Sequence, residues 1–93
     1  MKISDIRMFL LRPPRGNLHA IATVTFDQAL VVSDFRILEK HGRWFVGMPG
    51  RKNRQGEYVD TVFPIDNGLM DSLQRLVLRA FQDEQARFEG TGF

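Results

Sequence analysis

The stretch from Leu18 to Phe26 alternates between two classes of side chain, and this alternation constrains the fold more than any other feature. One face of the stretch would carry Leu18, Ala20, Ala22, Val24 and Phe26, and the other His19, Ile21, Thr23 and Thr25. A period of two with β-branched residues is typical of a strand that packs one face against a core. The stretch therefore predicts a strand in an antiparallel sheet.

Four further stretches have the composition of strands and are separated by short turn sequences. They are residues 3–12, 30–38, 44–48 and 57–63. The pair Pro13-Pro14 is expected to end the first strand, because proline has no N–H to donate. Residues 30–38 are apolar on both faces, which predicts a central strand whose other face or edge meets a partner chain. Residues 50–56 are predicted to form a mobile loop with glycines at both ends.

The residues after Pro64 have the periodicity of a helix. Asp66 or Asn67 can cap its first turn by accepting hydrogen bonds from free backbone N–H groups. One stripe at helical spacing contains Leu69, Leu73, Leu76, Val77, Ala80 and Phe81. The predicted architecture is an α+β domain over residues 1–93, in which an antiparallel sheet of about five strands carries a C-terminal helix on one face.

Size and composition exclude several classes of protein. A 93-residue chain is expected to form one domain, and a domain this small gains buried surface by dimerisation. The absence of cysteine excludes disulfides and thiolate metal sites and suits a reducing, cytoplasmic location. No stretch approaches the roughly 20 apolar residues of a membrane span, and the apolar run at residues 8–11 is too short for a secretory signal.

A basic cluster lies between the last two predicted strands. Arg51, Lys52 and Arg54 fall within four residues, with no acidic residue among them. Such side chains contact phosphates and release counterions, and the nearby Tyr58 suits stacking on single-stranded bases. The other interpretation is a solvated hairpin tip, because charged tips are common. The net charge of only +2 does not decide between the two.

Arg75 and Arg79 form a second basic candidate, since residues four apart are neighbours on a helix. They would extend a basic surface that the cluster at residues 51–54 begins. The alternative is that they keep the helix soluble and pair with Asp71 or Asp83.

The sequence shows no pattern typical of catalysis or cofactor binding. His19 and His41 do not have a metal-ligand spacing, and no serine lies in a nucleophile motif. Four residues are predicted to lie in the core or in an interface, namely Trp44, Phe45, Met48 and Phe63. We therefore expect a protein that is not an enzyme, has no cofactor or metal, and has no small-molecule substrate.

Several segments together resemble one family. They are ATVTFD at 22–27, VVSDFRIL at 31–38, FVGMPGRK at 45–52, GEYVD at 56–60 and Pro64-Ile65. In order and spacing they are similar to the SpoVG family (stage V sporulation protein G) over roughly residues 3–82. Two residues depart from the family pattern. Gly50 stands where the family commonly has serine, and is expected to loosen the loop. Phe63 stands where the family commonly has histidine.

The resemblance implies a homodimeric bacterial regulator that binds DNA and RNA and catalyses no reaction. The implied nucleic-acid contacts are the basic residues after Met-Pro, here Arg51 and Lys52, with Arg54 nearby. The first hypothesis is therefore a cytoplasmic homodimer that binds DNA or RNA. The alternative is an adaptor that regulates cell division or septation by docking another protein at a sheet edge or helix, without nucleic-acid contact.

Overall fold

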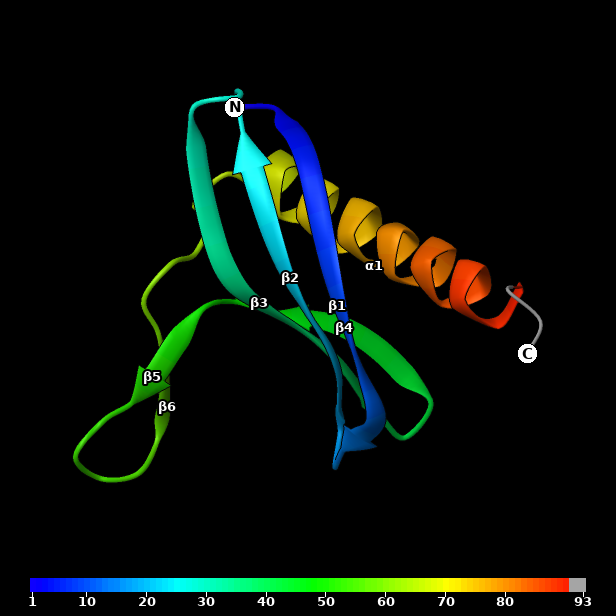
Figure 1. Ribbon diagram of the computed structural model, residues 1–93. Helices are drawn as coiled ribbons and strands as arrows, with labels where there is room; N and C mark the ends of the chain where they lie inside the picture. The colour runs from blue at the N-terminus through cyan, green and yellow to red at the C-terminus, as the bar shows by residue number, and fades with distance from the viewer. Residues whose placement is uncertain (91–93) are drawn as a thin grey trace.

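The computed structural model describes residues 1–90, which form six strands and one helix (Figure 1). The elements in chain order are β1 (Ile3–Arg15), β2 (Leu18–Phe26), β3 (Leu30–Lys40), β4 (Arg43–Gly47), β5 (Gly50–Lys52), β6 (Tyr58–Asp60) and α1 (Asn67–Gly90). The predicted α+β class and the C-terminal helix are confirmed.

The strands form two sheets. Strands β1 to β4 make a four-stranded antiparallel sheet in sequential order, and β5 pairs only with β6. The prediction of one five-stranded sheet is therefore wrong in its last member. Residues 58–60 fold back on residues 50–52, which the sequence analysis had interpreted as loop. The result is a small separate hairpin beside the main sheet.

The double proline does not end the first strand, which continues to Arg15. The pairing of β1 with β2 is irregular between Leu10 and Arg15, and both prolines lie within that irregular part. A proline there removes no regular ladder hydrogen bond, because the regular register has already stopped. The lack of an N–H on proline therefore interrupts the regular pairing of β1 with β2, but it does not end the strand.

The core lies between α1 and one face of the main sheet. Its sheet side includes Ala20, Ala22, Val24 and Phe26 of β2, which confirms the predicted alternation from Ala20 onward. His19 was predicted on the opposite face, and this is wrong, because its ring centre lies 4.6 Å from that of Trp44 and 6.5 Å from that of Phe81 of the helix. Its helix side contains Leu73, Val77 and Phe81. The helix begins with Asp66 as its cap, since Oδ2 of Asp66 accepts a 2.8 Å hydrogen bond from the Leu69 amide.

Gln74 of α1 closes the outer edge of β4. Its Oε1 accepts a hydrogen bond from the Val46 amide, its Nε2 donates to the Val46 carbonyl, and both distances are 2.9 Å. An edge strand with free N–H and C=O groups invites pairing with another chain. The side-chain amide takes the place of a neighbouring strand at this position and ties the helix to the sheet.

Candidate nucleic-acid interface

The predicted basic cluster lies on a hairpin that projects from the body of the molecule (Figure 1). We call residues 50–60 the arm. Its two short strands pair Gly50 with Asp60, Arg51 with Val59 and Lys52 with Tyr58. Because side chains alternate along a strand, Lys52 and Tyr58 share one face of the arm and Arg51 lies on the other.

The tip of the arm is a closed turn built around Asn53. Oδ1 of Asn53 accepts hydrogen bonds from the amides of Gln55 and Glu57, each at 2.9 Å. The backbone amide of Asn53 donates to the backbone carbonyl of Glu57 at 2.8 Å. Gly56 has a φ of 80°, a conformation that favours glycine. The prediction of a loose loop is therefore wrong, because these bonds fix the backbone of residues 53–57.

The base of the arm is anchored by Arg36 of β3. Its guanidinium lies over the Tyr58 ring, 4.0 Å from the ring centre. The Arg36 Nη2 and the Tyr58 hydroxyl both donate to the Met48 carbonyl, at 3.1 Å and 3.3 Å. Gly47 makes room for this arginine, since a Cβ there would lie 2.7 Å from Nη2. A cation on an aromatic face with shared hydrogen bonds fixes how the arm leaves the sheet.

Gly50 is required by close packing within the arm. A Cβ at this position would collide with the Val59 carbonyl oxygen and lie 2.8 Å from the Tyr58 ring. The expectation that Gly50 loosens the segment is therefore wrong. Its missing side chain lets the two strands of the arm and the tyrosine ring approach each other.

The three cations of the arm are exposed and unpaired. Within residues 1–90, the side chains of Arg51, Lys52 and Arg54 make no ion pair or hydrogen bond. Two carboxylates share the arm, but Glu57 accepts from Asn53 at 3.4 Å and Asp60 lies opposite Gly50. The positive charges are therefore available to an anion in solvent.

Tyr58 is only partly available as a stacking surface. Its side chain is 43% exposed, but one face of the ring is covered by Arg36 and the hydroxyl is bonded to Met48. The sequence predicts Tyr58 in a strand, with a ring suited to stacking on bases. In the structure it also positions the arm.

Arg75 and Arg79 are exposed on α1 but are not brought to the arm. Figure 1 shows the arm and the helix leaving the sheet in different directions. Neither arginine forms an ion pair within the described residues, so the alternative of pairing with Asp71 or Asp83 does not describe them either. They form a separate basic strip on the outer face of the helix.

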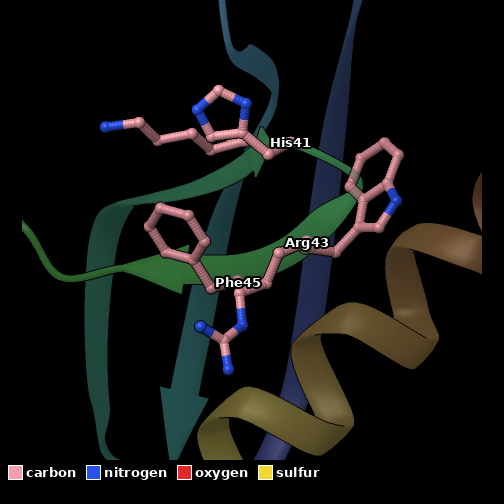
Figure 2. Close-up of a pocket in the computed structure, with 5 residues that line it drawn as sticks. His41, Arg43 and Phe45 are labelled. Atoms are coloured by element: carbon pink, nitrogen blue, oxygen red, sulfur yellow. The ribbon is translucent and has the colours of Figure 1, made fainter.

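A second basic and aromatic cluster, which the sequence analysis missed, surrounds the turn between β3 and β4 (Figure 2). A shallow hollow there is lined by Lys40, His41, Arg43, Trp44 and Phe45. Trp44 packs toward the helix, with its ring centre 5.3 Å from that of Phe81. Phe45, predicted to lie in a core or interface, is 36% exposed. The signal was present as cations on both sides of the turn, next to two aromatic residues.

The helix α1 lacks the combination of length and apolar character needed to cross a membrane, and it is the only helix in residues 1–90.

Comparison with known proteins identifies one family throughout. The SpoVG family model matches residues 1–83. A protein of Caldanaerobacter subterraneus subsp. tengcongensis named "Putative septation protein SpoVG" is 35% identical over 82 residues, which cover 88% of this chain and 89% of its own length. Proteins of the same name from Oceanobacillus iheyensis and Clostridioides difficile are 32% and 34% identical. They cover 99% and 96% of this chain, and 98% and 96% of their own lengths.

Proposed function

The chain belongs to the SpoVG family, and from this membership and the geometry of the arm we propose that it is a regulator that binds DNA or RNA as a homodimer. The observation that carries the proposal is the display of Arg51, Lys52 and Arg54. These three side chains are exposed, unpaired within the described residues, and held on a hairpin whose base and tip are both fixed by hydrogen bonds.

The physical basis is electrostatic. Each phosphate that a lysine or arginine contacts releases condensed counterions, and this gain does not depend on the base sequence. A rigid arm loses less conformational entropy on binding than a loose loop, so more of the electrostatic gain remains as affinity. The expected binding is therefore tolerant of sequence and strongly dependent on salt.

The test replaces Arg51, Lys52 and Arg54 by alanine and follows binding of labelled DNA and RNA by fluorescence anisotropy over a range of salt concentrations. Removing three phosphate contacts is expected to make the slope of log K against log salt shallower by about two to three units for each arm engaged. An unchanged slope and affinity would show that this site is wrongly assigned.

The homodimer is proposed to form through an apolar patch at the end of the sheet near the start of α1. The patch consists of the exposed residues Leu30, Val62 and Phe63, which line an apolar groove, and the exposed Ile65, which follows them in the chain. Within residues 1–90 the first half of β3 has no strand partner on this side, because β4 pairs with β3 only from Arg36 onward. A second copy is the proposed occupant, since a twofold interface buries the same patch on both chains. The two arms of one dimer would then bind the same nucleic acid together and raise the avidity of the dimer for it.

Sedimentation velocity of the wild type and of Phe63→Glu tests the dimer. Phe63 is exposed, so the charge is expected to disrupt the contact between copies without unfolding the chain. The wild type is expected to sediment as a dimer at micromolar concentration and the variant as a monomer with an unchanged circular dichroism spectrum. A monomeric wild type would contradict the proposal.

The same patch supports a second candidate, an adaptor for a protein of cell division or septation. Its groove is almost wholly apolar, and the net charge of the chain is only +2. Salt separates the two functions, because apolar docking responds little to added salt whereas phosphate contacts weaken steeply. If nucleic-acid binding is absent at low salt, the adaptor becomes the better proposal.

A further inference from the structure

One face of the main sheet is not covered by any strand or helix of residues 1–90. The helix packs against the face that carries Ala20, Ala22, Phe35 and Ile37, and Figure 1 shows no element among these residues over the other side. Because side chains alternate along a strand, the residues next to these core residues in sequence point to the uncovered side. We call it the open face. Sheets in soluble proteins usually leave such a face polar, so its composition is informative.

Aromatic and apolar residues form contiguous rows on the open face. The pairing places Phe9 of β1 beside Ile21 of β2, and Ile21 beside Arg36 of β3. The next row pairs Leu38 with Phe45 of β4. Phe9 is 67% exposed and Phe45 is 36% exposed. Two exposed phenylalanines on a sheet surface form an apolar patch with two π faces directed at solvent.

All charged side chains in these rows are cationic. Arg36 lies in the row of Phe9, and Lys40 and Arg43 form the next cross-strand pair beyond Phe45. The carboxylates Asp5 and Asp34 lie toward the opposite end of the strands, and Asp5 is paired with Arg7 at 3.3 Å. A partner that is purely apolar or cationic would leave these positive charges desolvated without compensation. The face is complementary to a polyanion that also offers flat apolar surfaces.

The open face is continuous with the arm. Arg36 contacts both surfaces, since it lies in the row of Phe9 and its guanidinium packs on Tyr58 of the arm. Lys52 pairs directly with Tyr58 on the same side of the arm. Arg36 is half-buried, so the exposed cations lie on the arm and at Lys40 and Arg43, and Arg36 is the residue that joins the two surfaces.

We propose that the open face is a base-stacking platform for single-stranded nucleic acid, on which Phe9 and Phe45 stack bases while Lys40 and Arg43 contact phosphates. This proposal rests on the proposed function and adds the substrate class. In a duplex the faces of the bases are stacked on each other and unavailable, whereas a single strand offers them to aromatic side chains. Three inter-strand spacings separate β1 from β4, about 14 Å, so one strand a few nucleotides long spans both rings.

The test compares the wild type with the double variant Phe9→Leu, Phe45→Leu. Leucine keeps an apolar side chain of similar reach and removes only the aromatic face, so the fold and any apolar contact are retained. Anisotropy is measured with an RNA strand and a DNA strand of about ten nucleotides, and with the duplex of the same sequence. The variant is expected to lose about tenfold in single-strand affinity for each ring and less than twofold in duplex affinity.

The outcomes separate the two proposals. If the wild type binds no nucleic acid at low salt, the proposed function itself fails. If the wild type binds but the double variant keeps its single-strand affinity, the stacking platform is overturned and the arm proposal stands. Comparison of the RNA and DNA strands tells which sugar the platform accepts.

Photo-cross-linking to 5-bromouracil strands gives a direct readout of position. Cross-linked peptides containing Phe9 or Phe45 are expected, and cross-links confined to Tyr58 and the rest of the arm would overturn the platform. Sedimentation of Phe9→Ala, Phe45→Ala tests whether a second copy covers the face instead. Conversion to a monomer with unchanged single-strand affinity per chain would assign the face to self-association and also overturn the proposal.

Discussion

The body of the molecule and the arm hold their shapes by different forces. In the body, the main sheet and α1 bury a continuous apolar core, with Phe35, Ile37 and Val77 almost fully removed from solvent. In the arm, residues 51–60 are all exposed, and geometry comes from the Arg36 anchor and the Asn53 turn. Apolar burial tolerates few changes, whereas surface charges can change freely. The comparison predicts that the cations of the arm can be removed with little loss of stability, whereas the buried side chains of the body cannot.

The largest expected effect is a loss of stability from a change in the core of the body. Phe35→Ala removes a side chain that is 1% exposed, and we expect a loss of about 3–5 kcal/mol in the free energy of unfolding. The matched control is Phe9→Ala, the same chemical change at an exposed position, with an expected loss below about 1 kcal/mol. Urea unfolding followed by the fluorescence of Trp44, which packs on Phe81, measures both. Equal losses would contradict the assignment of the core to one face of the sheet.

A smaller effect is expected where the arm depends on close packing. Gly50→Ala places a Cβ against the Val59 carbonyl oxygen and the Tyr58 ring, so the two strands of the arm must separate. Overpacking of this kind costs about 1–3 kcal/mol, and here the cost is expected to appear as opening of the arm. Hydrogen exchange by NMR is expected to accelerate at the amides of residues 50–60 and to stay unchanged in β2. Unchanged exchange throughout would show that the collision is relieved elsewhere.

The turn at the tip is expected to contribute less. Asn53→Ala removes the acceptor for the amides of Gln55 and Glu57, a loss of about 1 kcal/mol confined to the tip. Asn53→Asp keeps the acceptor oxygen, adds a negative charge among the cations, and replaces the donor to the Glu57 carboxylate by a second carboxylate. We therefore expect the aspartate variant to retain part of the exchange protection of the tip and to bind nucleic acid more weakly. If it protects the tip no better than the alanine variant at high salt, where repulsion between the two carboxylates is screened, Asn53 does not act as the acceptor of this turn.

The contrast between body and arm also explains what the sequence could predict. The alternation of β2 from Ala20 onward and the stripe of α1 are local patterns that follow from one buried face, and both are confirmed. The hairpin of β5 and β6 depends on the fit of Gly50 under Tyr58 and on Arg36, which lies far upstream in the chain. No pattern within the segment encodes such long-range contacts, so residues 50–56 were interpreted as loop, whereas residues 57–63, which contain β6, were predicted to be a strand.

Part of the candidate site was likewise visible in the sequence, and part was not. The cluster of Arg51, Lys52 and Arg54 was visible because its charges are adjacent in sequence. The pairing of Arg36 with Tyr58 and the exposure of Phe45 were not, because alternation alone does not tell which face of β4 the helix covers. Arg75 and Arg79 fulfilled the spacing rule, but the direction of α1 takes them away from the arm.

The smallest expected effect on stability comes from removing arginines of the arm, where the expected change is in nucleic-acid binding. Arg51→Ala, Arg54→Ala removes two exposed, unpaired guanidinium groups from the arm, and we expect the unfolding free energy to change by less than about 0.5 kcal/mol. Arg75→Ala, Arg79→Ala removes the same two groups from the outer face of α1, so it lowers the net charge equally. If the arm is the contact surface, the first pair is expected to weaken nucleic-acid binding and flatten its salt dependence by about two units, and the second to do so far less. Equal weakening by both pairs would mean that net charge governs binding and that the geometry of the arm has no part in it, because only the positions of the removed charges differ between the two variants.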